Sequence, residues 1–146
     1  MLQRLAETVL SACRADTAGI SLLEIHDGVE VFRWEALAGV CVAARNTKLP
    51  RAASPCGICI AQDKTTLMCL PERWFPAVPR DPQFVEVLLV PFHYQGKPIG
   101  TVWAIMHQFE RKFDLEDARL LEGLAALASA GWQLWRAQSA LEDRVA

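Results

Sequence analysis

The sequence predicts an α+β fold, in which a mainly antiparallel sheet carries both terminal helices on one of its faces. Three observations lead to this fold class. Apolar residues recur at helical spacing at both ends of the chain, in residues 1–14 and again from residue 114 onward. Between them lie two pairs of apolar runs, each joined by a short turn, in residues 18–38 and 84–107. The length of 146 residues is typical of one domain, so these elements are expected to share a single fold.

The first expected element is a helix over residues 1–14, followed by a β-hairpin. The apolar residues of this helix are spaced three or four apart and form one face. They are Leu2, Leu5, Ala6, Val9, Leu10 and Cys13. The hairpin would pair residues 18–25 with residues 29–38 across a turn at residues 26–28.

The middle of the chain is rich in proline and is expected to be irregular. A short helix is expected over residues 55–62, because Ser54 can cap it and Pro55 suits the first helical position. Residues 65–70 are expected to form a short strand. Residues 71–82 would then form a long aromatic loop, and loops of this length in a compact domain usually have a function.

The last third of the chain is expected to form a second hairpin and a long helix. The hairpin pairs residues 84–93 with 98–107 around a turn at residues 94–97. The helix is expected over residues 114–140, because Asp114 can accept hydrogen bonds from its first turn.

Apolar residues continue along this last helix beyond the part that a sheet would cover. In residues 136–146 the pattern thins, but Ala137 and Leu141 are still four apart. This segment is therefore expected to lead toward an output domain or a dimer partner.

Composition and charge disfavour several classes of protein. The net charge of −2 provides no basic excess for binding nucleic acid. No uninterrupted apolar run approaches the ~20 residues that a membrane span needs. The five cysteines are an odd number, and the first residues do not read as a signal peptide, so a reducing cytoplasm with free thiols is expected.

Two stretches of the second half resemble GAF domains, which are PAS-like small-molecule sensor modules of bacterial signalling proteins. They are VEVLLVPFHYQGKPIGTVWAI (residues 85–105) and RKFDLEDARLLEGLAALA (residues 111–128). Residues 54–76 also resemble the middle of GAF domains found in bacterial sensor histidine kinases. The resemblance implies a sheet of about six antiparallel strands, with the terminal helices on one face and a ligand pocket on the other, roofed by residues 45–82.

Strand periodicity then sorts the side chains expected at this pocket. We expect Trp103, Ile105 and His107 to face it, together with Glu86, Leu88, Val90 and Phe92 of the neighbouring strand. The candidate ligand-pocket residues are Cys56, Trp74, Phe75, Glu86, Trp103, Ile105 and His107. The alternative is that Trp103 and Ile105 simply fill the space as core residues.

Cys56 and Cys59 form the one CxxC pair of the sequence. Such a pair can be oxidised to a disulfide, can supply two metal ligands, or can consist of two small buried residues on a helix. The expected N-terminal position of Cys56 in its helix would lower the pKa of its thiol. Redox sensing by this pair is kept as an alternative function, and no metal site is assigned.

One branch of the GAF family, the free methionine-R-sulfoxide reductases, is catalytic through thiols. Cys56 matches one thiol of that branch, but Asn46, Val78 and Pro79 occupy the regions of the other two. Reductase activity is therefore not expected, and no catalytic residue is assigned.

Two other GAF ligands are disfavoured in the same way. Cyclic-nucleotide GAF domains share Phe113 and Asp117, but this chain has Ala118 and His107 at other positions of their pattern. Bilin-binding GAF domains usually attach their chromophore through a cysteine followed by histidine, and no cysteine here has that neighbour.

The resemblance thus implies a regulatory domain that binds an unknown small ligand or a partner. It would relay this event through its C-terminal helix to an output domain such as the histidine kinase of a two-component system. A homodimer through helices 1–14 and 114–143 is expected. The alternative is a dimerisation module with a filled pocket and no sensing role.

Overall fold

The computed structural model describes residues 1–145 and contains one six-stranded antiparallel sheet, with the strand order β3-β2-β1-β6-β5-β4. The helices are α1 (Leu2–Ala12), α2 (Pro55–Gln62) and α3 (Leu115–Val145), and the strands are β1 (Thr17–His26), β2 (Val29–Gly39), β3 (Lys48–Pro50), β4 (Thr66–Cys69), β5 (Glu86–Tyr94) and β6 (Lys97–Met106). No helix within residues 1–145 is long and apolar enough to cross a membrane.

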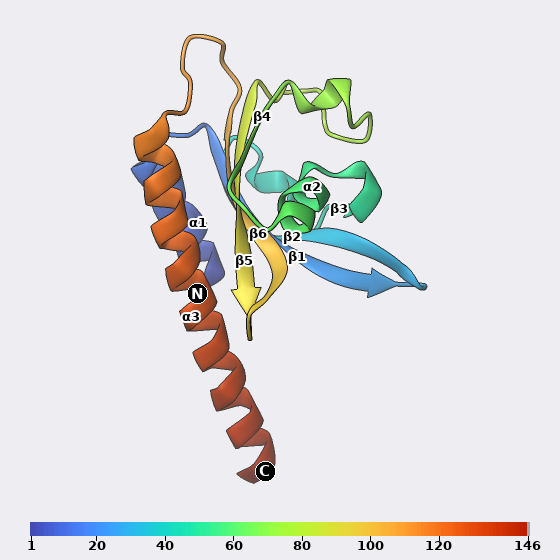
Figure 1. The fold of residues 1–146 in the computed structure, drawn as a ribbon, viewed down its shortest axis with the longest axis vertical. Helices are drawn as coiled ribbons and strands as arrows, with labels where there is room; N and C mark the ends of the chain where they lie inside the picture. Colours follow the sequence, from blue (N-terminus) through green and yellow to red (C-terminus); the bar gives the residue numbers. More distant parts are fainter. Residues whose placement is uncertain (146) are drawn as a thin grey trace.

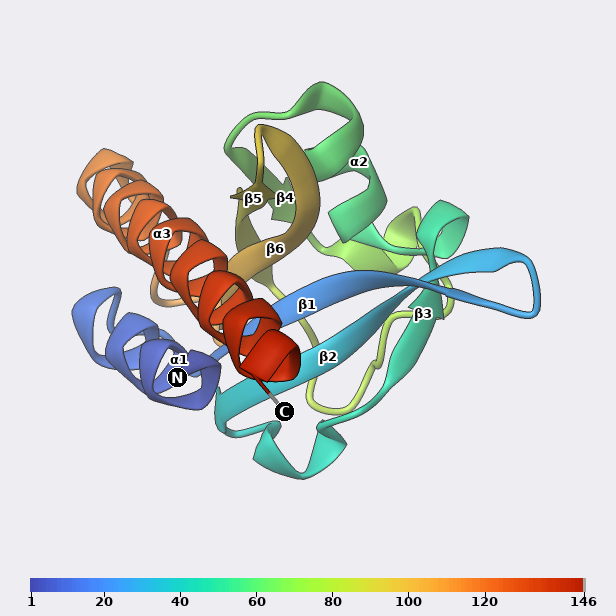
Figure 2. The same ribbon diagram turned by 90° about the horizontal axis from the view of Figure 1, so that it is seen from below.

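The two terminal helices cover one face of the sheet, and α2 lies on the other (Figures 1 and 2). This arrangement confirms the predicted α+β fold with its antiparallel sheet. Residues 51–53 pack beside α2, and the segment 70–85 contributes Phe75, Val78 and Phe84 to the core on that side. The sheet therefore separates two cores, one beneath the terminal helices and one beneath α2.

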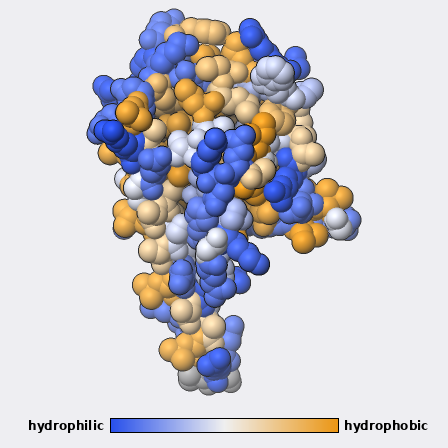
Figure 3. Space-filling view, viewed as in Figure 1, coloured by the Kyte–Doolittle hydropathy of each residue, from blue (hydrophilic) through white to orange (hydrophobic). Residues whose placement is uncertain are grey.

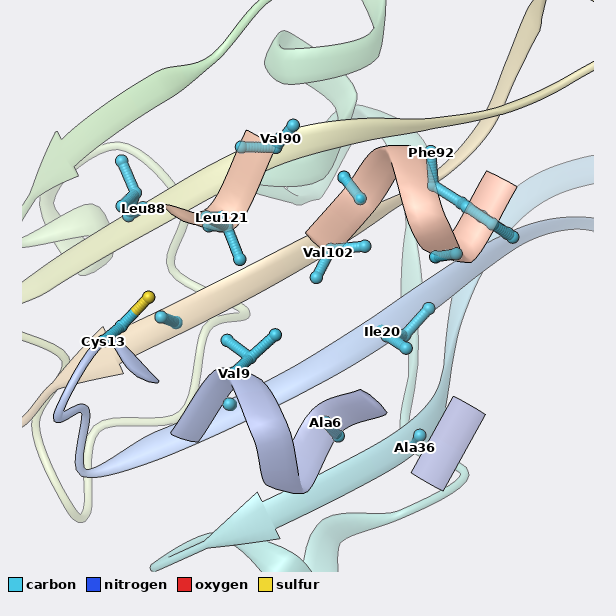
Figure 4. Packing of buried hydrophobic residues seen from close by; sticks show 14 of the residues in the cluster. Ala6, Val9, Cys13, Ile20, Ala36, Leu88, Val90, Phe92, Val102 and Leu121 are labelled. Carbon is cyan, nitrogen blue, oxygen red and sulfur yellow. The ribbon is translucent and has the colours of Figure 1, made fainter. Parts of the chain in front are cut away.

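The core beneath the terminal helices is built from alternate residues of the central strands and from one face of each helix. Leu88, Val90 and Phe92 of β5 point toward α3 (Figure 4). Val9 of α1 and Leu121 of α3 are both fully buried against them. Burial of this apolar surface fixes α1 and the first half of α3 on the sheet.

The second core lies between the sheet and α2 and contains more aromatic side chains. It includes Phe32, Trp34, Phe75, Phe84 and Trp103, all less than 9% exposed. The predicted aromatic loop therefore contributes Phe75 to the core rather than remaining free of it.

Most of the predicted elements appear close to their expected limits. The short helix has the expected bounds, and the Ser54 hydroxyl accepts a hydrogen bond from the Cys56 backbone N–H at 3.2 Å. The sequence did not predict β3, because a strand of three residues at the sheet edge has too little alternation to be recognised.

The predicted orientation of β5 is wrong, because a β-bulge shifts its register. At the turn Tyr94 pairs with Lys97, but the register shifts by one residue between Phe92 and His93. Leu89 and Val87 therefore lie opposite Trp103 and Ile105. Opposed residues share a face, so Val87 and Leu89 face α2, whereas the even-numbered residues from 86 to 92 face the terminal helices.

The last helix begins at a reciprocal cap and runs well past the sheet (Figure 1). The Asp114 carboxylate accepts from the Asp117 backbone N–H, and the Asp117 carboxylate accepts from the Asp114 N–H, both at 2.9 Å. The helix is longer than the predicted 114–140. Residue 146 is the last residue of the segment 136–146 that is expected to lead toward a partner, and it lies outside the described residues.

Candidate functional site

The space between the sheet and α2 holds a small cavity. Its volume is about 30 Å³, and its lining is almost entirely apolar. A single water needs roughly 10–15 Å³ of such space, so this cavity accommodates one or two waters rather than a metabolite. The lining includes the sequence-predicted residues Cys56, Trp103 and Ile105.

Trp103 of β6 occupies the centre of this space. Its indole N–H donates to the Ser21 hydroxyl at 2.8 Å, so the buried nitrogen is satisfied. Its ring packs edge-on against Trp34, with ring centroids 5.5 Å apart. It also lies directly over Gly19, where a Cβ atom would come within 2.6 Å of the ring. The predicted alternative, in which Trp103 fills the core, therefore describes this arrangement.

Two aromatic residues of the predicted pocket are placed differently from expectation. Phe75 is buried in the core beneath α2 but does not line the cavity. Trp74 is 73% exposed and points away from that core. The residue that closes the cavity from the loop is Val78, which the sequence analysis did not select.

Glu86 lies on the opposite face of the sheet from the cavity, as the β5 register requires. The residue is only 3% exposed. Its carboxylate accepts a hydrogen bond from the Phe113 backbone N–H at 2.7 Å and lies 3.7 Å from the Cys69 sulfur. Glu86 therefore anchors the chain just before α3 instead of contributing an acid to the cavity.

Cys56 and Cys59 are free, buried thiols. Burial raises the pKa of Cys59 to about 12, and it also raises the pKa of Cys56. The expected lowering at Cys56 is wrong, because burial outweighs its hydrogen bonds with Thr101 and Ser54. Within residues 1–145, no three His, Cys, Asp or Glu side chains are grouped closely enough to hold a metal ion.

His107 lies beyond the cavity, at the end of the sheet where β6 stops. Its Nδ1 lies 2.8 Å from the Gln83 backbone carbonyl, and its Nε2 lies 3.7 Å from the sulfur of Cys41. Cys41 was missed by the sequence analysis, because 66 residues separate it from His107 and no motif links the two. Only the antiparallel pairing through β1 brings these two residues together.

The outer surface of α3 carries leucines at intervals of seven residues, all of them exposed. They are Leu120, Leu127, Leu134 and Leu141. A small residue lies three positions after each of the first three leucines, namely Gly123, Ala130 and Ala137. Figure 3 shows apolar side chains on the part of α3 that extends past the sheet.

Comparison with known proteins identifies related sequences and structures. A family model described as GAF domain matches residues 1–133. The second GAF domain of DevS from Mycobacterium smegmatis superposes with a TM-score of 0.78 at 17% identity, over 96% of each chain. No curated protein sequence matches the chain significantly.

Two further solved structures differ in the activity that their names state. The GAF domain from an Acinetobacter phosphoenolpyruvate-protein phosphotransferase has a TM-score of 0.73 at 19% identity, over 88% of this chain and 78% of that one. The free methionine-R-sulfoxide reductase from Neisseria meningitidis, solved with its substrate, has a TM-score of 0.66 at 20% identity, over 88% and 74%. At these identities the likeness demonstrates a shared fold.

Proposed function

This chain belongs to the GAF domain family, and from that premise we propose that it is a regulatory domain of a signalling protein whose α3 pairs with α3 of a second copy. The observation that carries this proposal is the exposed leucine repeat on α3. A seven-residue apolar repeat is the pattern by which two helices supercoil around each other. GAF domains typically serve as sensory or regulatory modules of signalling proteins.

The repeat extends along nearly the whole of α3 and has no partner within the described chain. Leu127, Leu134 and Leu141 are each more than 60% exposed. Gly123, Ala130 and Ala137 lie on the same side, and such small residues let two helix backbones approach closely. These leucines and small residues together form one continuous stripe along α3, here called the seam, along which a second helix can pack.

A parallel pair suits a relay function best. Each leucine then meets its own copy across a two-fold axis, so that one stripe serves both protomers. Both copies of α3 also leave the paired domains in the same direction. Along the first half of α3, the seam borders a groove between α1 and α3 that is lined by Leu5 and Leu127, among others. The contribution of α1 to the dimer is therefore part of the proposal.

The small cavity argues against metabolite binding between the sheet and α2 and favours a regulatory role exerted through the dimer. Trp34 and Trp103 occupy the space between the sheet and α2 and leave about 30 Å³. Binding of a metabolite there would require Trp103 to leave Ser21, at the cost of a buried hydrogen bond. We therefore propose that the aromatic residues stabilise the domain and that signals pass through α3.

We propose that the chain is not a methionine-R-sulfoxide reductase, although relatives with that activity share its fold. Cys56 is buried, and its thiol accepts a hydrogen bond from the Thr101 hydroxyl at 3.0 Å. Val78 is a buried core residue, and Asn46 is exposed. The direct test is incubation with free methionine-R-sulfoxide and dithiothreitol, from which we expect no methionine. Turnover above that of dithiothreitol alone would contradict this proposal.

The output of the domain is proposed by analogy. The similar GAF domain from Acinetobacter belongs to a phosphoenolpyruvate-protein phosphotransferase. We propose that this domain is also part of a larger signalling protein and that α3 connects it to an output enzyme, such as the histidine kinase of a bacterial two-component system in the cytoplasm.

The experiment that tests the dimer is sedimentation equilibrium of the chain and of the double variant Leu134→Glu with Leu141→Glu. Introduced charges on both sides of the seam repel each other, so we expect a dimer for the original chain and a monomer for the variant. Ile25→Glu is the matched control, because Ile25 is 72% exposed at the β1–β2 turn, away from α3. A monomeric original chain, or a variant that remains dimeric, would contradict the proposal.

A further inference from the structure

A cysteine and a histidine converge at the end of the sheet, outside the cavity and the α3 seam. Cys41 follows β2, and His107 follows β6. The Cys41 sulfur lies 3.7 Å from Nε2 of His107. Cys41 is half-buried, and its neighbours Val40 and Val42 are both more than half exposed, so this segment lies at the surface. Cys41 therefore keeps some exposed surface, unlike the buried Cys13, Cys56 and Cys59.

His107 is held so that Nε2 faces the thiol. Its Nδ1 lies 2.8 Å from the Gln83 carbonyl, which can only accept, so Nδ1 carries a proton. In the neutral ring Nε2 is then the nitrogen without a proton, and it accepts a hydrogen bond from the Thr17 hydroxyl 2.8 Å away. The backbone N–H of His107 donates to the Asp16 carboxylate at 2.8 Å. The Phe84 ring packs against the imidazole, with the two ring centroids 5.4 Å apart. A base oriented by a third group beside a thiol is the arrangement that activates a cysteine nucleophile.

Thr17 completes the cluster and ties its members together. Its hydroxyl, in a residue with no exposed surface, lies 2.8 Å from Nε2 of His107. It also accepts a hydrogen bond from the Cys41 backbone N–H at 3.3 Å. Thr17 of β1 therefore holds the backbone of Cys41 and the ring of His107 next to each other.

The acid–base properties of the cluster agree with this geometry. Burial by itself would raise the pKa of the Cys41 thiol, but the hydrogen bonds from His107 and Thr17 outweigh it and hold the pKa below its ordinary value. Burial likewise opposes the charged form of His107, yet Cys41, the Gln83 carbonyl and Asp16 raise its pKa. Both directions make it easier for the proton of the Cys41 thiol to move to Nε2 of His107.

The other buried thiols of the chain have the opposite character. Burial raises the pKa of Cys13 to about 11 and that of Cys59 to about 12, and it raises that of Cys56 as well. Cys69 is exposed, but its hydrogen-bond partner is the Glu86 carboxylate rather than an imidazole. Cys41 is thus distinguished from the CxxC pair that the sequence singles out.

We propose that Cys41 is a peroxide-reactive thiol for which His107 acts as the base. This proposal does not depend on the α3 dimer. His107 takes the proton of the Cys41 S–H, and the thiolate attacks one oxygen of a hydroperoxide. An S–O bond forms while the O–O bond breaks, and its electron pair leaves on the second oxygen, which takes the proton back from His107. The products are Cys41 sulfenic acid and an alcohol, or water when the oxidant is hydrogen peroxide.

The position of the cluster indicates how such a modification reaches the rest of the fold. His107 is the first residue of the segment that joins β6 to α3. Asp16, which holds the His107 backbone, also pairs with Arg111 of the same segment at 2.5 Å. Oxidation adds an oxygen atom to the Cys41 sulfur in a half-buried site next to His107, so we expect the segment before α3 to shift.

The first test uses the other four cysteines of the chain as internal controls. The reduced protein is treated with iodoacetamide at pH 6.5, and the alkylation rate of each cysteine is measured by mass spectrometry of its peptide. We expect Cys41 to react on the order of tenfold faster than the exposed Cys69, because thiolates rather than thiols react. A Cys41 rate equal to or below that of Cys69 would overturn the proposal.

The second test examines the base and the product. Hydrogen peroxide with dimedone, a trap for sulfenic acids, is expected to label Cys41 before any other cysteine. The variant His107→Gln, checked for folding by circular dichroism, is expected to lose most of this labelling and most of the fast alkylation at Cys41, but to keep the Cys69 rate. Labelling that begins at another cysteine, or a folded variant that keeps a fast Cys41, would refute the assignment.

Discussion

A single side chain, Trp103, determines what the space between the sheet and α2 can hold. Its ring fits there because Gly19 has no side chain and because Ser21 accepts its N–H. Both neighbours belong to β1, which pairs with β6 in the sheet. The sequence indicates an aromatic residue on this face, but the glycine and serine that receive it are recognisable only from the strand pairing.

We expect Gly19→Ala to destabilise the fold by about 1–3 kcal/mol, the usual cost of overpacking a core. The added Cβ would lie 2.6 Å from the Trp103 ring and 2.7 Å from the Ala36 carbonyl, which is backbone and cannot easily move. Urea denaturation measures the loss. Ile25→Ala is the control, because Ile25 lies on the same strand but is 72% exposed and outside both cores. Equal stability changes in both variants would contradict this account.

Trp103→Ala is expected to cost about 3–5 kcal/mol and to leave an apolar cavity large enough for an aromatic probe. We expect indole to raise the melting temperature of this variant and not that of the original chain, whose cavity is about 30 Å³. A similar increase for the original chain would show that the space already admits ligands.

Among the elements, α3 depends on contacts made before its first turn. Asp114 and Asp117 cap each other's backbone, and the buried carboxylate of Glu86 receives the Phe113 N–H. The sequence predicted the Asp114 cap, because capping is a local pattern. The anchoring role of Glu86 could not be predicted in this way, because Glu86 is 27 residues from Phe113 in the sequence. It faces α3 only because of the bulge between Phe92 and His93.

Glu86→Ala is expected to destabilise the fold by about 1–3 kcal/mol, because the buried Phe113 N–H would lose its acceptor. Glu86→Gln keeps an acceptor oxygen and should recover most of this loss. Hydrogen exchange at Phe113 is expected to accelerate in the alanine variant and to return toward the original rate in the glutamine variant. An alanine variant as stable as the glutamine variant would contradict the anchoring role.

Structural features that depend on neighbouring residues can be predicted from the sequence, whereas features that depend on strand pairing cannot. Helix α2 was predicted with its correct bounds, since Ser54 and Pro55 act on their immediate neighbours. One bulge residue inverted the predicted face of β5, because periodicity gives the alternation but not its phase across a turn. The Cys41–His107 pair was not foreseeable, since its members meet only through sheet pairing.

At the scale of the whole molecule, one sheet has a core on each of its two faces, and α3 extends beyond both cores (Figure 1). The first half of α3 is buried on one side against β5 and α1, whereas its leucine repeat faces outward along its length. The domain therefore offers a second copy a preformed helical surface, and both sheet contacts and dimer contacts would act on the same helix. Any change at the sheet that shifts α3 would also alter the dimer.

The central claim, a parallel dimer through the leucines of α3, is tested most directly by disulfide cross-linking. Leu141→Cys and the matched variant Asp143→Cys are prepared in chains whose Cys41 and Cys69 are replaced by serine. In a parallel pair the two copies of residue 141 face each other across the axis, whereas residue 143 lies away from the seam. We expect mild oxidation to convert Leu141→Cys into a covalent dimer and to leave Asp143→Cys monomeric on a non-reducing gel. Equal cross-linking of the two variants, or none in Leu141→Cys, would contradict the parallel α3 dimer.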